Sequence, residues 1–264
     1  MNEKASGNTI CIGFRNARSG VHLARTIMLE ELQNLLAYVE NSNADKSDYS
    51  EAIIQDNCLS KRSENTRILT ARHLTHLYAL DPKVILFRNL QFFWDRDIAG
   101  QPLLALLCAY ARDSILRLST GFIMDHPLGE VVKREALENI IDSKETGRFS
   151  KATLKSTAQN INATWTKSGH LTGRAKKIRT QAHATPGSVS YALLLGYLNG
   201  LRGESIFKSE YVRLLDCSFD RSIELATEAS RKGWIVLNRL GSVIEVLFPN
   251  LLSKEEQEWV HEQN

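Results

Sequence analysis

Residues 150–179 read SKATLKSTAQNINATWTKSGHLTGRAKKIR, a pattern that indicates a helix followed by a hairpin. Ser150 is a typical helix N-cap, and Gly169 can supply the left-handed conformation that ends a helix. Between them an apolar stripe recurs at spacings of four, three and four residues: Leu154, Ala158, Ile161 and Trp165. These spacings place the stripe on one helix face. The sequence therefore predicts a helix over 150–168 that buries Trp165.

The opposite face of this predicted helix is made of small or uncharged polar residues with one terminal cation: Thr153, Ser156, Gln159, Asn160, Ala163 and Lys167. Such a face can enter a major groove and contact base edges. The next stretch, 170–185, carries four cations and predicts a two-stranded wing: Arg174, Lys176, Lys177 and Arg179. A helix, a turn, a polar-faced helix and a basic wing follow one another in winged helix-turn-helix proteins.

Charge is unevenly distributed along the chain, although the net charge of +3 is mild. Residues 146–203 contain no Asp or Glu and nine cations: Arg148, Lys151, Lys155, Lys167, Arg174, Lys176, Lys177, Arg179 and Arg202. A charge run is usually a solvated face, but solubility alone does not explain the lack of every acid. We therefore expect a polyanion partner here. Residues 204–264 reverse the balance, with 11 acids against seven Lys or Arg.

Upstream, helical periodicity and capping residues predict a helical domain over 21–125, after an N-terminal tail at 1–20. The expected helices cover 21–40, 49–58, 64–80, the residues that follow Asp81-Pro82, and 103–118, which is apolar nearly all round. Ser63 is the predicted N-cap of the 64–80 helix. The pair of helices within about 49–80 forms a first predicted helix-turn-helix.

Downstream of this domain, a helix over 130–142 and the 150–185 elements make a basic winged-helix-like module at 126–203. A second winged-helix-like module is predicted at 204–250. It has helices at 207–215 and 219–232, and a hairpin built from 234–237 and 243–248. Its second helix has mixed charge, which favours protein contacts or domain packing over DNA. Residues 251–264 form an acidic C-terminal helix or tail. The fold class expected is thus mainly α, a helical bundle with helix-turn-helix and winged-helix modules and short hairpin wings.

Composition and motifs exclude several classes of protein. Apolar residues make up 43% and charged residues 24%, as in globular proteins. We expect a cytoplasmic protein, because no apolar stretch is long enough for a membrane span and no signal peptide is recognisable. The four cysteines are widely scattered, and the His73 and His76 pair has no third ligand, so neither a disulfide framework nor a metal site is expected. Nucleotide-binding and hydrolase motifs are absent, and we expect no cofactor and no catalytic residue.

Two short motifs resemble the BrxA family, an accessory component of bacteriophage exclusion (BREX) systems. The first spans 51–66 and reads EAIIQDNCLSKRSENT, with an acidic-Asn-x-Leu turn followed by a basic residue and Ser. The second is Phe149-Ser150-x-x-Thr153-x-Lys155, followed by Gly169-His170-Leu171. The resemblance covers about residues 20–180. The chain differs from the family in its first 20 residues and in the extra segment after 180.

The resemblance implies a nearly all-helical protein with two helix-turn-helix elements that binds double-stranded DNA, has no enzyme activity and serves beside a methyltransferase and other defence proteins. A first group of phosphate-binding cations is then expected at the first helix-turn-helix: Lys61, Arg62, Arg67 and Arg72. A second group is expected on the 150–168 helix and its wing, together with the polar residues Ser156, Gln159 and Asn160. We expect both groups to lie on one side of the folded protein, which would be a monomer in isolation. The alternative is a protein-interaction scaffold of the defence complex without direct DNA binding.

Overall fold

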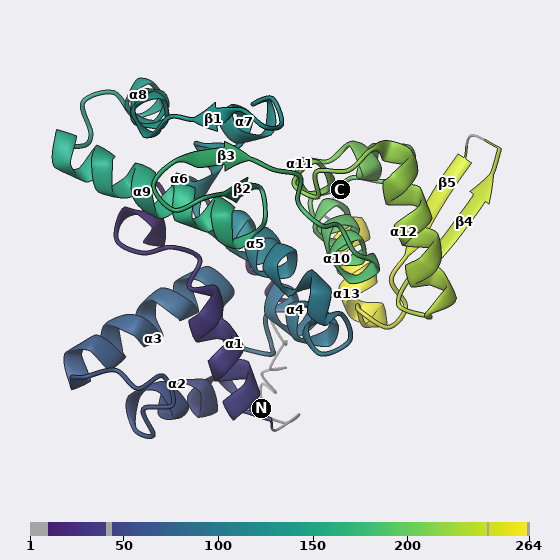
Figure 1. Ribbon diagram of the computed structural model, residues 1–264. Helices are drawn as coiled ribbons and strands as arrows, with labels where there is room; N and C mark the ends of the chain where they lie inside the picture. Colours follow the sequence, from purple (N-terminus) through teal and green to yellow (C-terminus); the bar gives the residue numbers. More distant parts are fainter. Residues whose placement is uncertain (1–9, 41–43, 242, 263–264) are drawn as a thin grey trace.

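The structure is a computed structural model that describes residues 10–40, 44–241 and 243–262. It is mainly helical, with two small antiparallel sheets. The predicted mainly α fold class is therefore confirmed. Figure 1 shows helices α1 to α5 in the lower left and centre, the first sheet above them, and the second sheet projecting at the right.

The N-terminal helices are η1 (Val21–Leu23), α1 (Leu29–Tyr38), α2 (Lys46–Ile54), α3 (Glu64–Tyr78) and α4 (Ile85–Trp94). The predicted helix pair around 49–80 is present as α2 and α3, and the Ser63 side chain accepts the Thr66 N–H as its N-cap. The predicted continuous helix over 21–40 is wrong, because only α1 is α-helical within it. Met28 precedes α1 in the left-handed conformation, and η1 is held by contacts to distant residues described below.

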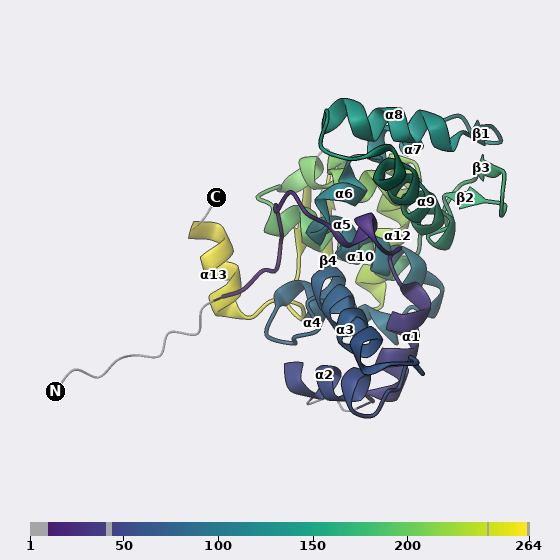
Figure 2. The ribbon, with the colours of Figure 1, turned by 90° about the vertical axis from the view of Figure 1, so that its left-hand side faces the viewer.

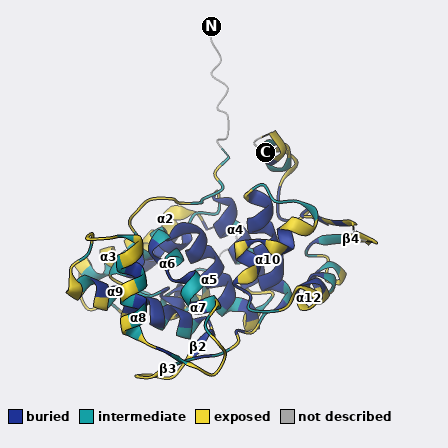
Figure 3. Ribbon diagram, turned by 90° about the horizontal axis from the view of Figure 1, so that it is seen from above, coloured by how far each residue is buried: buried dark blue, intermediate teal, exposed yellow. Residues whose placement is uncertain are grey.

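The centre of the molecule contains η2 (Ile98–Gly100), α5 (Gln101–Arg112), α6 (Ser114–Arg117), α7 (Thr120–Met124) and α10 (Pro186–Leu198). The predicted 103–118 helix breaks at Asp113, whose Oδ1 accepts the N–H groups of Ile115 and Leu116 and so starts α6. No element was predicted for 186–203, yet α10 packs against both α4 and α5. Figure 3 shows the buried residues gathered along these central helices.

The middle part of the chain runs through β1 (Val131–Val132), α8 (Arg134–Lys144), α9 (Lys151–Lys167), β2 (Leu171–Thr172) and β3 (Lys177–Arg179). The strand order is β1-β3-β2, and both pairs are antiparallel. Ser150 caps α9 by accepting the Thr153 N–H, and Gly169 ends it at φ +88°. Trp165 is fully buried, as predicted, and its Nε1 donates to Ser119 at 2.8 Å.

The C-terminal part consists of η3 (Gly203–Lys208), α11 (Glu210–Arg213), α12 (Phe219–Arg231), β4 (Val236–Leu240), β5 (Val243–Leu247) and α13 (Lys254–Glu262). The predicted second helix and the hairpin are present, and Leu240 pairs with Val243 across its turn. The predicted helix over 207–215 is split between η3 and α11 at Ser209, whose side chain caps α11. Across the described ranges, no helix combines the length and apolar character that a membrane crossing requires.

The predicted N-terminal tail over 1–20 is only partly described, and its first nine residues lie outside the described ranges. Residues 10–20 are not a tail, because their backbone is built into the bundle. The carbonyls of Cys11 and Ile12 accept the N–H groups of Ile85 and Leu86 at the start of α4. Figures 1 and 2 show the segment 14–28 crossing between α9 on one side and α3 on the other.

Candidate nucleic-acid interface

The outer face of α9 carries the residues predicted to contact DNA. Lys151, Lys155 and Gln159 are exposed, while Ser156 is half-buried and donates to the Thr153 carbonyl at 3.0 Å. Asn160 is engaged in the fold, since its Nδ2 donates to the His22 carbonyl at 3.1 Å. Two lysines and one amide of this face are therefore accessible to a ligand, whereas Asn160 positions η1 instead.

The hairpin loop between β2 and β3, which was predicted to be a wing, holds two exposed cations, Arg174 and Lys176, and neither forms an ion pair with any residue that the structure describes. Lys177 is half-buried, donates to the Gly173 carbonyl at 2.6 Å, and has its pKa lowered by burial. The tip of the wing, rather than its second strand, is thus available to a polyanion.

Arg179 corrects the sequence-based assignment of a phosphate contact. Its side chain is only 2% exposed and forms a bidentate pair with Asp216, with both N–O distances at 2.8 Å. Its Nε also donates to the Ile123 carbonyl at 2.9 Å. A guanidinium held by these partners cannot reach a phosphate in this structure, so Arg179 is removed from the predicted interface.

Two other predicted contacts are partly neutralised by neighbouring acids of α1. Lys61 pairs with Glu31 at 3.1 Å, and Lys167 pairs with Glu30 at 2.7 Å. The Lys167 ammonium, by hydrogen bond and charge, lowers the pKa of Glu30. These lysines connect the loop before α3 and the end of α9 to the start of α1. Their contribution to phosphate binding is reduced accordingly.

On α3 the remaining predicted cations are Arg62, Arg67 and Arg72. Arg62 and Arg72 are exposed and have no acidic partner among the described residues. Arg67 is half-buried, with a 3.4 Å contact from its Nη1 to the Gln55 carbonyl. Arg62 and Arg72 are therefore the cations that α3 and its preceding turn present to solvent.

Sequence reasoning missed three further cations in the segment that crosses between α3 and α9. Arg15, Arg18 and Arg25 are exposed, and none has an acidic partner within the described ranges. Arg25 and Arg72 both lower the pKa of His73, after the larger effect of its burial, which shows that charges of the segment and of α3 are close. The sequence did contain a signal for these three arginines, because no Asp or Glu occurs between Glu3 and Glu30.

A buried polar network fixes this segment in place. Asp113 Oδ2 accepts the N–H groups of Val21 and His22 at 2.6 and 3.2 Å, and lies 2.9 Å from His22 Nδ1. On its other side the His22 Nε2 lies 2.9 Å from the Thr164 hydroxyl of α9, which accepts the Ile27 N–H. Burial would raise the pKa of Asp113, but the His22 charge and these hydrogen bonds hold it well below its ordinary value. The network joins η1 to both α5–α6 and α9.

The N-terminal ends of α3 and α9 lie on the same side of the molecule, at the left of Figure 1, with the segment 14–28 between them. The wing projects beside α9. The N-terminal ends of α3 and α9 thus face the same side, whereas the β2–β3 hairpin extends to the right in Figure 2. That the two groups hold one duplex together stays a prediction.

Four cations of the C-terminal part behave differently, because each pairs with an acid. The ion pairs are Arg213–Asp125, Lys208–Glu204, Arg221–Glu224 and Lys232–Glu228. Charges balanced in this way form an ordinary solvated surface. These four cations are therefore less available to a polyanion than the unpaired cations of α3, the segment, α9 and the wing.

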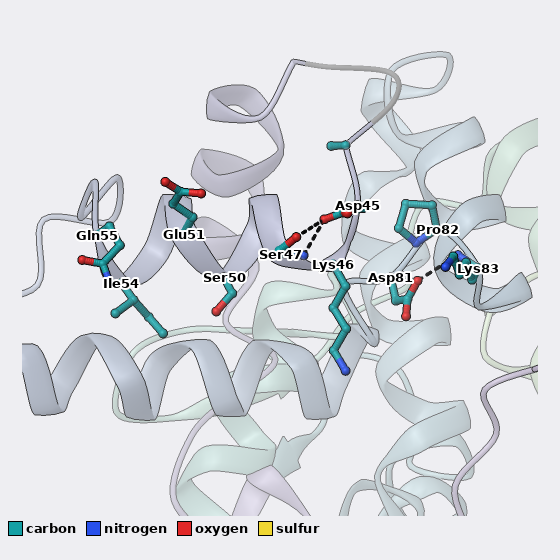
Figure 4. Close-up of a pocket in the computed structure, with 11 residues that line it drawn as sticks. Asp45, Lys46, Ser47, Ser50, Glu51, Ile54, Gln55, Asp81, Pro82 and Lys83 are labelled. Atoms are coloured by element: carbon teal, nitrogen blue, oxygen red, sulfur yellow. Dashed lines mark hydrogen bonds between the residues drawn. The ribbon is translucent and has the colours of Figure 1, made fainter.

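A cavity of about 940 Å³ lies away from these cations, between α2 and the α3–α4 connection. Figure 4 shows Asp45 engaged with Ser47, and Asp81 engaged with the backbone of Lys83. Both acids are therefore occupied as caps of the local backbone. The cavity has mixed charge and offers no concentrated cationic surface to a nucleic acid.

The two motifs that resemble the BrxA family have structural roles in this protein. Asn57 adopts a positive φ, and its amide makes two hydrogen bonds with the backbone of Lys61, which closes the turn before α3. Leu59 is buried beneath that turn. In the second motif Ser150 caps α9, and Leu171 is buried where β2 begins.

No family model matches the chain, and no curated protein matches it at a significant level.

Proposed function

We propose that the chain is a double-stranded DNA-binding protein without a catalytic step of its own, and that β1, α8, α9, β2 and β3 form a winged helix. The order of these elements and the strand order β1-β3-β2 are those expected of a winged helix, with α9 as its recognition helix. The small side chains on the outer face of α9 allow close approach to a groove, and Gln159 is its candidate base-reading group.

The observation that carries this proposal is that nine exposed cations on the segment 14–28, α3 with its preceding turn, α9 and the β2–β3 hairpin have no acidic partner among the described residues. They are Arg15, Arg18, Arg25, Arg62, Arg72, Lys151, Lys155, Arg174 and Lys176. Unpaired like charges repel each other and weaken folding, so a shared anionic partner is the physical reason to keep them together. Duplex DNA presents a dense, regular array of phosphates to such a surface.

The test is a titration of blunt duplex DNA with the full chain at several salt concentrations. Replacing Lys151, Lys155, Arg174 and Lys176 by Ala should weaken binding to all sequences about equally and reduce the salt slope by roughly 0.9 for each phosphate that is no longer bound. Replacing Lys208, Arg213, Arg221 and Lys232 by Ala changes the net charge equally and serves as the matched control. Equal losses of affinity in the two variants would refute the proposed interface.

The motif resemblance supports one more specific proposal, that this DNA binder serves a BREX phage-defence system beside its methyltransferase. Because the matching residues close turns and cap helices, they support a shared scaffold rather than shared base contacts. Co-purification of the tagged chain with the methyltransferase of such a system, and loss of phage protection on its deletion, would test this role.

A second candidate function, a protein-interaction scaffold, is favoured by the β4–β5 hairpin. Leu240 and Val243 face each other across its turn and are 85% and 67% exposed, and Leu247 is also exposed. Exposed apolar clusters of this kind often mark protein contacts. Two results together would favour this candidate. The chain would fail to bind duplex DNA at low salt, and it would bind a protein partner that is lost when Leu240 and Val243 are replaced.

A further inference from the structure

A groove of about 800 Å³ lies beside α4, between the end of α1 and Asn250 of the β5–α13 connection. Leu36 and Val39 of α1 and Phe92 of α4 contribute apolar surface to its lining. Small-molecule sites commonly have this size and combine an apolar lining with a few placed polar groups. None of the nine cations of the proposed DNA interface is among the residues that line the groove, so the two surfaces are separate.

One polar residue of this lining, Asn89, is almost completely buried and keeps an unsatisfied acceptor. Asn89 is 1% exposed, and its Nδ2 donates to the Ile85 carbonyl at 2.8 Å and to the Leu251 carbonyl at 3.1 Å. Because both partners are carbonyls, the amide nitrogen must face them, which fixes the orientation of the amide. Its Oδ1 retains accessible surface and receives no hydrogen bond from a described residue. A ligand that donates to this oxygen would recover the free energy that the missing hydrogen bond costs.

Two further amides of the groove have their nitrogens engaged in the same way. Gln91 Nε2 donates to the Tyr49 hydroxyl at 2.6 Å, and Asn250 Nδ2 donates to the Gly233 carbonyl at 3.0 Å. The oxygen atoms of both amides accept no hydrogen bond within the described ranges. The amides of the groove therefore bond to the protein through nitrogen and leave oxygen acceptors for a ligand.

The charged residues of the lining favour a cation. Glu40 and Asp95 are exposed, and neither forms an ion pair in the part of the chain that the structure describes. Arg88 is paired with Glu256 at 2.7 Å, and the charge of Arg96 is offset by that of its neighbour Asp95. Glu40 therefore leaves the groove with a net negative charge.

We propose that this groove binds a primary alkylammonium group, which donates to Asn89 Oδ1 and lays its alkyl stem against the apolar lining. A primary ammonium has three donors and no acceptor, which complements a lining whose free polar atoms are oxygens. Its methylene stem covers apolar surface while the charged head keeps its polar contacts. A divalent metal ion fits less well, because such ions require several converging oxygens and gain nothing from apolar walls. The ammonium belongs either to a free linear diamine or to a lysine side chain.

The test is an NMR titration of the full chain with pentylammonium at low, constant ionic strength. Pentylammonium should bind roughly tenfold more tightly than tetramethylammonium, which has the same charge but no hydrogen-bond donor. Asn89→Leu should erase this difference, and Glu40→Gln should weaken pentylammonium binding by up to about fivefold. Glu64→Gln is the matched control, because Glu64 is an exposed acid of α3 that does not line the groove, and it should leave both affinities unchanged.

Asn89→Leu also removes the hydrogen bonds to the Ile85 and Leu251 carbonyls, so its folding is checked by urea denaturation. If this variant does not fold, the side-chain amide resonance of Asn89 in the unaltered protein decides, since pentylammonium should shift it and tetramethylammonium should not. Three results would overturn the proposal: equal affinities for the two ions, a preference that survives in folded Asn89→Leu, or displacement of pentylammonium by a lower concentration of Mg²⁺.

Two further probes distinguish the sources of the ammonium. Tighter binding of putrescine assigns the groove to a free diamine, whereas tighter binding of Nα-acetyl-lysine methylamide assigns it to a lysine side chain of a protein partner. Asn89→Leu should leave the salt-dependent affinity for blunt duplex DNA unchanged. The ammonium site and the proposed DNA interface can therefore fail independently.

Discussion

Arg179 of β3 and Asp216 of the α11–α12 connection form two parallel hydrogen bonds, each 2.8 Å long, in a site where the arginine side chain is 2% exposed. Asp216 Oδ2 also accepts the Ala182 N–H at 3.0 Å. This pair connects the wing strand to the C-terminal part of the chain. The Arg179–Asp216 pair therefore has a structural role and is not a DNA contact. The local sequence of the β2–β3 hairpin does not distinguish these two roles.

We expect Arg179→Ala to lower the free energy of unfolding by about 3–5 kcal/mol, because Asp216 would keep a largely buried charge without its partner. Urea denaturation of Arg179→Ala, Asp216→Ala and the double variant gives the coupling between them. Arg174→Ala on the exposed wing is the control and should leave stability unchanged. A salt slope of duplex binding that falls in folded Arg179→Ala would contradict this assignment.

Trp165→Ala should destabilise the protein by about 3–5 kcal/mol, since it empties a fully buried aromatic site and leaves Ser119 without its indole donor. Trp259→Ala, at a half-buried position of α13, should cost less. Thermal and urea unfolding of both variants provide the comparison. A Trp165→Ala variant as stable as the starting protein would show that this packing is misassigned.

Stability should fall as the pH decreases from about 6.5 towards 4, because burial lowers the pKa of His170 to about 4 from its ordinary value of 6.5. In this window the unfolded chain takes up a proton that the folded chain excludes, so unfolding is favoured as pH falls. The neutral ring fits its site, with Nε2 3.0 Å from the Leu214 carbonyl and Nδ1 2.9 Å from the Ser168 hydroxyl. The measurement is the urea midpoint of the starting protein and of His170→Gln at pH 7 and at pH 5. The midpoint of His170→Gln should fall less between the two pH values than that of the starting protein.

Gly20→Ala should displace the segment 14–28, because a Cβ at this position would overlap Asp113 Oδ1. We expect a loss of about 1–3 kcal/mol in stability, as for other overpacked sites, together with weaker duplex binding. Gly121→Ala is the matched control, since its added Cβ meets only an atom at 3.9 Å. Intact duplex affinity in a destabilised Gly20→Ala protein would show that the segment arginines do not contact DNA.

Duplex length tests whether the two basic groups act together. Binding should weaken in a step when the duplex becomes too short to span from α9 to α3, because the second contact is intramolecular only on a long duplex. Arg62→Ala with Arg72→Ala should then matter only above that length. A smooth decrease with length would mean that one group binds alone.

Local patterns in the sequence were sufficient to predict α9, its Ser150 cap, its Gly169 end and the buried Trp165, since capping and periodicity act within a few residues. They were insufficient for α10, which is buried on every side and so shows no amphipathic stripe. They also missed the break at Asp113, where the local cap of α6 by Oδ1 is combined with Oδ2 contacts to Val21 and His22, more than 90 positions away.

The candidate site shows the same division. Exposure of Lys151, Lys155, Arg174 and Lys176 follows from their places on a helix face and a hairpin tip. The ion pairs of Lys61, Lys167 and Arg179 could not be predicted in this way. Their acidic partners, Glu31, Glu30 and Asp216, come from other parts of the chain. Arg15, Arg18 and Arg25 join the proposed interface only because the segment 14–28 docks between α3 and α9.

The docking of residues 20–28 also has a consequence for the order of events during synthesis. His22 finds its partners Asp113 and Thr164 at sequence separations of 91 and 142 residues. A segment made so long before its partners therefore has to wait, without these contacts, until α9 has been made. Contacts between residues so distant in the sequence slow folding. The isolated 126–203 fragment would also lack residues 20–28, which cover one side of α9. We expect residues 20–28, α5, α6 and α9 to fold as one cooperative unit.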